Sequence, residues 1–201
     1  MRNAFSVIGR ALKLWWHEFV LFIFFNIMWL ILQVPLVTGP AATAAMYGVA
    51  RRYYEEGMLY PMDGVQALRQ TFLPSLKWGA VNFLVVSALI VNFWFFQKNE
   101  GIEWSLLRIT WAVIGLGWFA VNLFYWPFWL AQRDRSLVTT LRNGMLFILK
   151  RPALSFALVL FSLALIIISV LTTLPLATVL MAWLALIGVI AVEEELKEKH
   201  E

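Results

Sequence analysis

Residues 154–192 read LSFALVLFSLALIIISVLTTLPLATVLMAWLALIGVIAV and contain no charged residue. A bilayer core of about 30 Å is crossed by about 20 helical residues, so this stretch is too long for one span. Residues 172–175, Thr-Thr-Leu-Pro, offer a turn near its middle. The stretch therefore predicts a tight hairpin of two transmembrane helices.

Three other apolar stretches extend this pattern. Residues 80–96 and 106–130 are each long enough for one span, whereas residues 19–50 are uncharged but interrupted by Pro35, Gly39 and Pro40. Proline suits the first turn of a helix, where its missing N–H would have no partner. A helix from Pro40 to about Glu56 would reach about 25 Å, enough to cross. We therefore predict an all-α polytopic membrane bundle of six transmembrane helices in three hairpins, forming one domain over residues 1–201.

The overall composition agrees with a membrane protein. Hydrophobic residues make up 62% of the chain and charged residues 14%, against roughly 25% charged in an ordinary soluble domain. The first apolar stretch lacks a small-residue cleavage site and is too long for a signal peptide, so we expect it to be retained.

The helix predicted after Pro40 is rich in small residues. Small side chains four positions apart let helix backbones approach closely, which favours association in lipid. We expect this helix to be central and buried, and we favour tight packing over a ligand groove as the role of these residues. The predicted packing residues are Gly39, Pro40, Ala41, Ala44, Ala45 and Gly48.

The basic residues predict the orientation. All of the sixteen except Lys98 and Arg108 lie in the segments expected on the side of the two termini. The positive-inside rule places that side in the cytoplasm. A five-span arrangement would put the basic N-terminus on the other side, so six spans agree better with the charge. We expect a multi-pass protein of the cell's inner membrane with both termini cytoplasmic.

Three segments outside the spans are amphipathic at helical spacing, and two of them share a Leu-Arg pattern at Arg69 and Arg142. Such helices lie in the membrane interface with their basic face toward lipid headgroups. The chain is therefore predicted to repeat one unit, an interfacial helix followed by a hairpin, over residues 1–58, 59–132 and 133–201. The predicted interface residues are Arg10, Lys13, Arg69, Arg142, Trp15 and Trp16.

Residues suited to chemistry are scarce in the predicted spans. No ionisable side chain lies clearly at bilayer depth, and the chain has no cysteine. We predict no catalytic residue, no metal site and no cofactor. The amides Asn26, Asn82 and Asn122 are the polar groups of interest. An amide in lipid needs a hydrogen-bond partner, so we favour contacts between helices, with a polar lining to a cavity as the alternative.

The stretch LQVPLVTGPAATAAMY at residues 32–47 resembles a signature of the YesL-like bacterial membrane proteins, the domain-of-unknown-function family 624. In that family a Pro-x-x-Thr, Gly-Pro-Ala, Ala-Ala-x-Tyr pattern follows the first span. The resemblance implies an accessory membrane subunit associated with carbohydrate uptake, with no assigned catalytic residue.

Three functional hypotheses follow. We favour a non-enzymatic accessory or scaffold subunit that binds another membrane protein, such as a transport system, or lipid. The alternatives are a small-molecule transporter or channel with an amide-lined path and, third, an enzyme acting on lipids near Glu55, Glu56 and Asp63. The lipid bilayer is the expected environment and nucleic acid is not an expected partner, because the membrane topology accounts for the pI near 9.6. The oligomeric state stays open.

Overall fold

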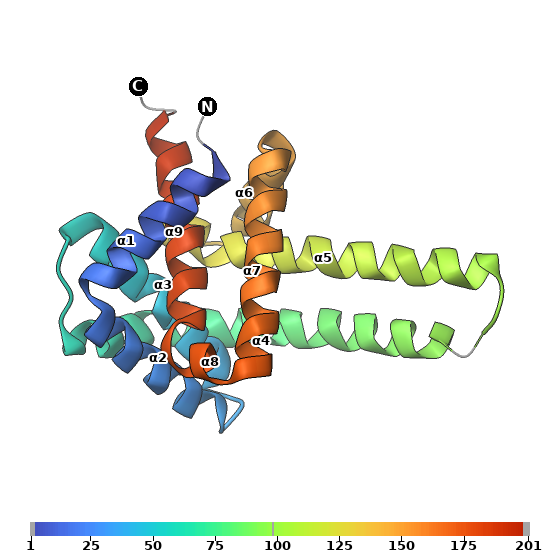
Figure 1. Cartoon of the computed structure of the whole chain (residues 1–201), viewed down its shortest axis with the longest axis horizontal. Helices are drawn as coiled ribbons and strands as arrows, with labels where there is room; N and C mark the ends of the chain where they lie inside the picture. The colour runs from blue at the N-terminus through green and yellow to red at the C-terminus, as the bar shows by residue number, and fades with distance from the viewer. Residues whose placement is uncertain (1–2, 98, 199–201) are drawn as a thin grey trace.

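The computed structural model describes residues 3–97 and 99–198, and within these residues every regular element is a helix (Figure 1). The all-helical prediction is therefore confirmed. The helices are α1 (Ala4–His17), α2 (Phe19–Gln33), α3 (Gly39–Glu56), α4 (Pro61–Gln97), α5 (Ile102–Ala131), α6 (Leu137–Lys150), α7 (Pro152–Thr172), α8 (Leu174–Thr178) and α9 (Leu180–Glu198).

Among the described residues, α4, α5 and α7 are long and apolar enough to cross a membrane. The pair α1 and α2 would make a fourth candidate, but the two helices bend by 96° at their junction. Two helices of the predicted six-span arrangement, α3 and α9, are not among the candidates. Helix α3 is rich in small residues and has a charged last turn, and the last turns of α9 contain Glu193, Glu194 and Glu195.

Interfacial and spanning helices are separate in only two of the three predicted units. Helix α1 ends before Glu18, and α6 and α7 are divided at Arg151. In the second unit the prediction of two helices is wrong, because α4 runs unbroken over 37 residues and contains Pro74. Proline removes one backbone hydrogen bond, and here the packing of α4 on α3 continues on both sides of it.

The predicted turn at residues 172–175 coincides with the end of α7 at Thr172, and Thr173 has a positive φ of 58°. The returning arm is not one helix, however. It is divided into α8 and α9 at Val179. The packing of α8 against α2 accounts for this break, because a side chain of α2 replaces the missing backbone bonds, as described below.

Helices α3 and α9 form the centre of the fold. Ala41 and Ala44 on α3, and Ala185 and Ile187 on α9, are completely buried. Helix α3 packs along the first half of α4 at close range, since a Cβ built on Gly48 would lie 3.0 Å from the Cβ of Ala67. Small side chains at this contact permit the close approach of the two helices.

Helices α4 and α5 form a long hairpin that extends away from the other helices and runs across the direction of α7 and α9 (Figure 1). The base of the hairpin is held by aromatic contacts. The rings of Trp78 and Tyr125 stack at a centroid distance of 3.7 Å, and the indole N–H of Trp118 donates to the Asn82 side chain at 3.0 Å. Beyond this base, residues 79–97 and 102–119 contain no buried side chain.

Candidate functional site

The last turns of α3 carry alternating basic and acidic residues. Arg51 pairs with Glu55 at 2.9 Å and Arg52 pairs with Glu56 at 3.2 Å, both at the i, i+4 spacing that brings side chains together on a helix. The helix stops at Gly57, whose φ of 73° lies in the left-handed region that glycine adopts without strain. This short segment therefore presents two arginine–glutamate pairs side by side.

Arg52 also reaches the start of α4. Its guanidinium lies 2.8 Å from the carboxylate of Asp63 and donates to Gln66 at 2.8 Å. Asp63 is buried, and its second oxygen accepts the backbone N–H of Tyr60 at 2.7 Å. Asp63 thus caps the N-terminus of α4 and neutralises Arg52 with the same carboxylate.

Arg51 connects α3 with two distant segments. It lies 3.1 Å from Glu193 on α9 and donates a hydrogen bond to the backbone carbonyl of Leu130 at the end of α5. Burial raises the pKa of Glu193, and the charge of Arg51 opposes that rise. One guanidinium therefore joins three helices that are separate in the sequence.

These residues surround a pocket of about 420 Å³ between α3, α4 and the end of α5. Arg135 forms one side of it, with its guanidinium 4.8 Å from the centre of the Trp129 ring. Among the described residues Arg135 has no ion-pair partner. The lining consists of Gly48, Arg51, Arg52, Glu55, Glu56, Asp63, Gln66, Ala67, Gln70, Thr71, Leu130 and Arg135.

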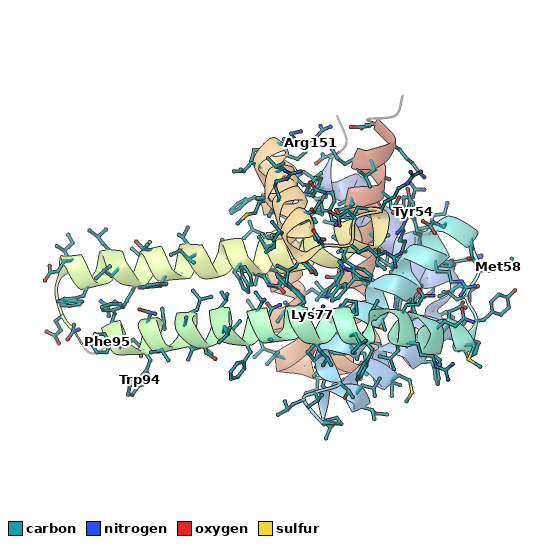
Figure 2. The ribbon with its side chains drawn as sticks, turned by 180° about the vertical axis from the view of Figure 1, so that it is seen from behind. Tyr54, Met58, Lys77, Trp94, Phe95 and Arg151 are labelled. Atoms are coloured by element: carbon teal, nitrogen blue, oxygen red, sulfur yellow. The ribbon has the colours of Figure 1, made fainter. Side chains whose placement is uncertain are left out.

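A second charged cluster joins the end of α9 to α1 and α7. Arg10 pairs with Glu194 at 2.7 Å, and Arg151 pairs with Glu195 at 3.0 Å and with Glu198 at 2.7 Å. Arg10 also lies over the ring of Tyr54 at 5.0 Å. Tyr54 and Arg151 are labelled on this end of the molecule in Figure 2. The cluster fixes the first and last described helices to one another.

The carboxylates named for the lipid-enzyme hypothesis do gather at one pocket. Each of them is paired with an arginine, and none is positioned as a free general base beside a nucleophile. Among residues 3–97 and 99–198 no group of His, Cys, Asp and Glu could hold a metal ion. The arrangement is suited to binding a charged group or to holding helices together.

The small residues predicted to pack lie largely inside the fold. Gly39, Ala41, Ala44 and Ala45 are buried, and Pro40 and Gly48 are half-buried. They belong to the helix that forms one side of the charged pocket. The predicted packing and the charged pocket therefore share one element.

The predicted interface residues divide into two groups. Lys13, Arg69, Arg142 and Trp16 are exposed. Trp15 is half-buried and packs edge-on against Trp183 of α9, and Arg10, although exposed, pairs with Glu194, so both connect α1 to α9. The amphipathic pattern does not distinguish a residue at the membrane interface from one that contacts another helix. Aromatic and basic residues occupy the same helical positions in both cases.

The three predicted amides form hydrogen bonds in two separate parts of the structure. Asn26 is completely buried and connects α2 to α8 and α9, Asn82 accepts from Trp118, and Asn122 donates to the backbone of its own helix. Asn82 and Asn122 thus share Trp118 as a partner, through its indole N–H and its backbone carbonyl, whereas Asn26 bonds to other residues. Sequence reasoning missed the pairs Arg51–Glu193 and Arg52–Asp63, and only the charge pattern of residues 51–56 indicated that ion pairs would form there.

No protein-family model, curated protein or solved structure matches the chain.

The role of Asp63 can be tested by substitution. Asp63→Ala removes a buried cap and a buried partner of Arg52, so we expect a loss of about 1–3 kcal/mol in stability. Glu56→Ala is the matched control, because it removes a half-exposed partner of the same arginine and should cost about 0.5 kcal/mol or less. Thermal unfolding of both variants in detergent, followed by tryptophan fluorescence, measures the difference. Equal losses would contradict the assignment of Asp63.

Proposed function

We propose that this chain is a non-enzymatic integral membrane protein that acts as an accessory subunit and pairs with another membrane protein through the α4–α5 hairpin. The observation that supports this is the isolation of the hairpin. Its outer part carries large exposed apolar side chains, including Phe83 at 72% and Leu84 at 68% on α4 and Ile109 at 60% on α5. These side chains are directed at lipid or at helices of another protein.

The length of the hairpin supports a position in the bilayer. Residues 78–97 of α4 contain no charge and, at 1.5 Å per residue, extend about 30 Å, which equals the thickness of a bilayer core. Residues 109–131 of α5 are also uncharged. Within α5 a Cβ built on Gly117 would meet no atom within 4 Å, so a partner helix could approach this backbone closely.

Membership of the YesL-like family is part of the same proposal and rests on the motif at residues 32–47. It suggests a component of a carbohydrate-uptake system as the partner. The absence of an unpaired carboxylate around the charged pocket agrees with a binding role for this chain.

Site-specific photo-crosslinking tests the partner surface. A photoreactive amino acid at Leu84 or Ile109 should form an adduct with a discrete membrane protein in native membranes. The same group at Val20, which is 64% exposed on α2, is the control and should not form that adduct. Adducts with lipid alone from both hairpin positions would refute the proposal.

We further propose the six-span topology, with both termini in the cytoplasm. It is supported by the placement of the basic residues and by the ion pair between Arg10 and Glu194, which brings the start and end of the chain to one side. In this topology the α4–α5 hairpin, which runs across the direction of α7 and α9 in the structure (Figure 1), would align with them in the bilayer, and α3 and α9 would cross while buried by the other helices. A buried helix needs no apolar surface toward lipid, so its low hydropathy is compatible with crossing.

Cysteine labelling tests this topology directly, because the chain has no cysteine of its own. Single cysteines at Leu36, Glu100 and Leu174 should react with a membrane-impermeant maleimide in intact cells. Cysteines at Lys13 and Glu198 should react only after permeabilisation. Labelling of Glu100 without Leu36 and Leu174 would show that the α2–α3 and α7–α9 pairs do not cross.

A further inference from the structure

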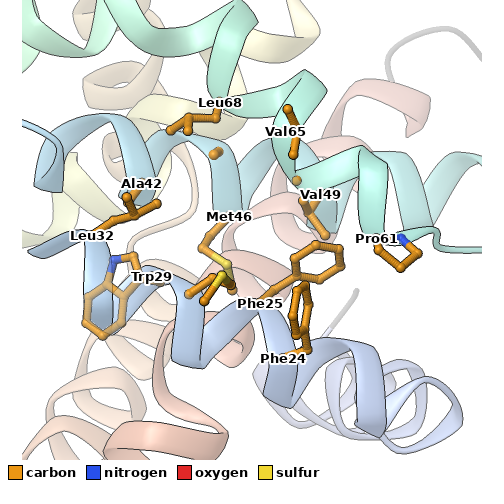
Figure 3. Close-up of a pocket in the computed structure, with 13 residues that line it drawn as sticks. Phe24, Phe25, Trp29, Leu32, Ala42, Met46, Val49, Pro61, Val65 and Leu68 are labelled. Carbon is orange, nitrogen blue, oxygen red and sulfur yellow. The ribbon is translucent and has the colours of Figure 1, made fainter.

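An apolar cavity of about 140 Å³ lies between α2, α3 and the beginning of α4 (Figure 3), and it shares no lining residue with the charged pocket. Helix α2 contributes Phe24, Met28 and Trp29, α3 contributes Ala45 and Met46, and α4 contributes Val65. Figure 3 draws the side chains that line this space on the three helices.

Small residues keep this cavity open. Ala42 and Ala45 form part of its wall on α3, and Gly64 lies opposite on α4. A Cβ built on Gly64 would lie 2.7 Å from a ring carbon of Phe25, which is itself buried. Larger side chains at these positions would therefore fill the space or push Phe25 into it.

The cavity offers no polar group for recognition. Its one side chain with a hydrogen-bond donor is Trp29, and that N–H is already donated to the hydroxyl of Thr43 at 3.0 Å. The wall is otherwise formed by aliphatic, aromatic, methionine, proline and glycine residues. A ligand in this space is therefore held by its hydrocarbon surface alone.

The size of the cavity limits what can enter. A helix with side chains is about 10 Å across, far too wide for a space of this volume. An engineered apolar cavity of about 150 Å³ in another protein stays dry and binds small hydrocarbons. Phe24, Met28 and Val65 are also between 37% and 44% exposed, so the cavity is open to its surroundings. A narrow flexible hydrocarbon chain satisfies both limits.

We propose that this cavity binds the alkyl chain of a membrane lipid or of a free fatty acid. The alkyl chain enters between Met28 of α2 and Val65 of α4 and fills the cavity next to Ala45 of α3. Methionine side chains adapt to a flexible ligand, and Met28 and Met46 both line the cavity. The binding is independent of the hairpin and of any partner protein.

Photolabelling of the purified full chain in detergent tests this site. Two probes carry the same diazirine near the end of a saturated chain, one as a free fatty acid and one as a phosphatidylethanolamine. Peptide mass spectrometry should place adducts on the segments around Met28 and Val65. Excess unlabelled palmitate or phosphatidylethanolamine should abolish them, and the probe that labels identifies the source of the chain.

Filling the cavity provides the decisive comparison. Ala45→Leu should abolish labelling of both segments, while Ala88→Leu, on the exposed outer part of α4, should leave it unchanged. Melting temperatures show whether the Ala45→Leu variant is folded. If that variant is unfolded, competition by unlabelled lipid on the unmodified protein decides whether the cavity binds an alkyl chain. Adducts that survive both the substitution and competition, or no adduct with either probe, would overturn the proposal.

Discussion

Replacing Asn26 with leucine is expected to lower the stability of the protein by about 3–6 kcal/mol, because three backbone groups would lose their partner in the interior. The Asn26 carbonyl oxygen accepts the N–H groups of Met181 at 2.9 Å and Ala182 at 3.2 Å. Its amide N–H donates to the carbonyl of Leu176 at 2.7 Å.

These bonds replace those lost where the helix is broken. In a continuous helix the Leu176 carbonyl would accept the N–H of Leu180, and the first N–H groups of α9 would bond to preceding carbonyls. The break at Val179 interrupts that pattern. Asn26 thus caps α8 and α9 from another helix, and its side chain is completely buried.

Asn122→Leu is the matched control for this prediction. Asn122 is half-buried and its amide bonds to the Trp118 carbonyl of its own helix, so its loss should cost about 1 kcal/mol or less. Tryptophan fluorescence during heating in detergent should show a melting temperature lower by roughly 10 °C or more for Asn26→Leu and only slightly lower for the control. Similar melting temperatures for the two variants would exclude the capping role.

Gly188→Ala is expected to cost about 3 kcal/mol, at the upper end of what overpacking produces. A Cβ built on Gly188 would lie 2.6 Å from the backbone oxygen of Leu123 and 3.1 Å from both Pro127 and Tyr47. The oxygen belongs to α5 and cannot rotate away as a side chain can. Helix α9 would have to move away from α3 and α5 at the centre of the fold.

Gly117→Ala separates this effect from a general response to alanine. Gly117 lies within α5, and an added Cβ would meet no atom within 4 Å. Alanine favours a helix over glycine by about 1 kcal/mol, so this variant should be as stable as the unmodified chain or slightly more so. Thermal unfolding should therefore move in opposite directions for the two substitutions, and a shared direction would contradict the packing explanation.

The sequence predicted features that depend on neighbouring residues. The uncharged stretch at 154–192 and the turn near Thr173 follow from local hydropathy and turn chemistry, and the structure has a helix end there. The separate second interfacial helix was predicted wrongly, because α4 continues through Pro74 and packs on α3 on both sides of it, at Ala67 with Gly48 and at Gly79 with Pro40. The candidate site could be predicted from the sequence only in part. The ion pairs within residues 51–56 are four positions apart, whereas Glu193 is distant in the sequence from its partner Arg51.

By itself, the sequence determined that this protein is helical, rich in membrane-compatible stretches and biased in its basic residues, because hydropathy and charge are properties of the residues themselves. Only the tertiary structure decided which polar groups meet. Asn26 lies about 150 positions from its partners, and Arg51 joins α3 to α5 and α9. Such contacts depend on how the helices pack, and a buried polar group is stable there only when that packing brings it a partner.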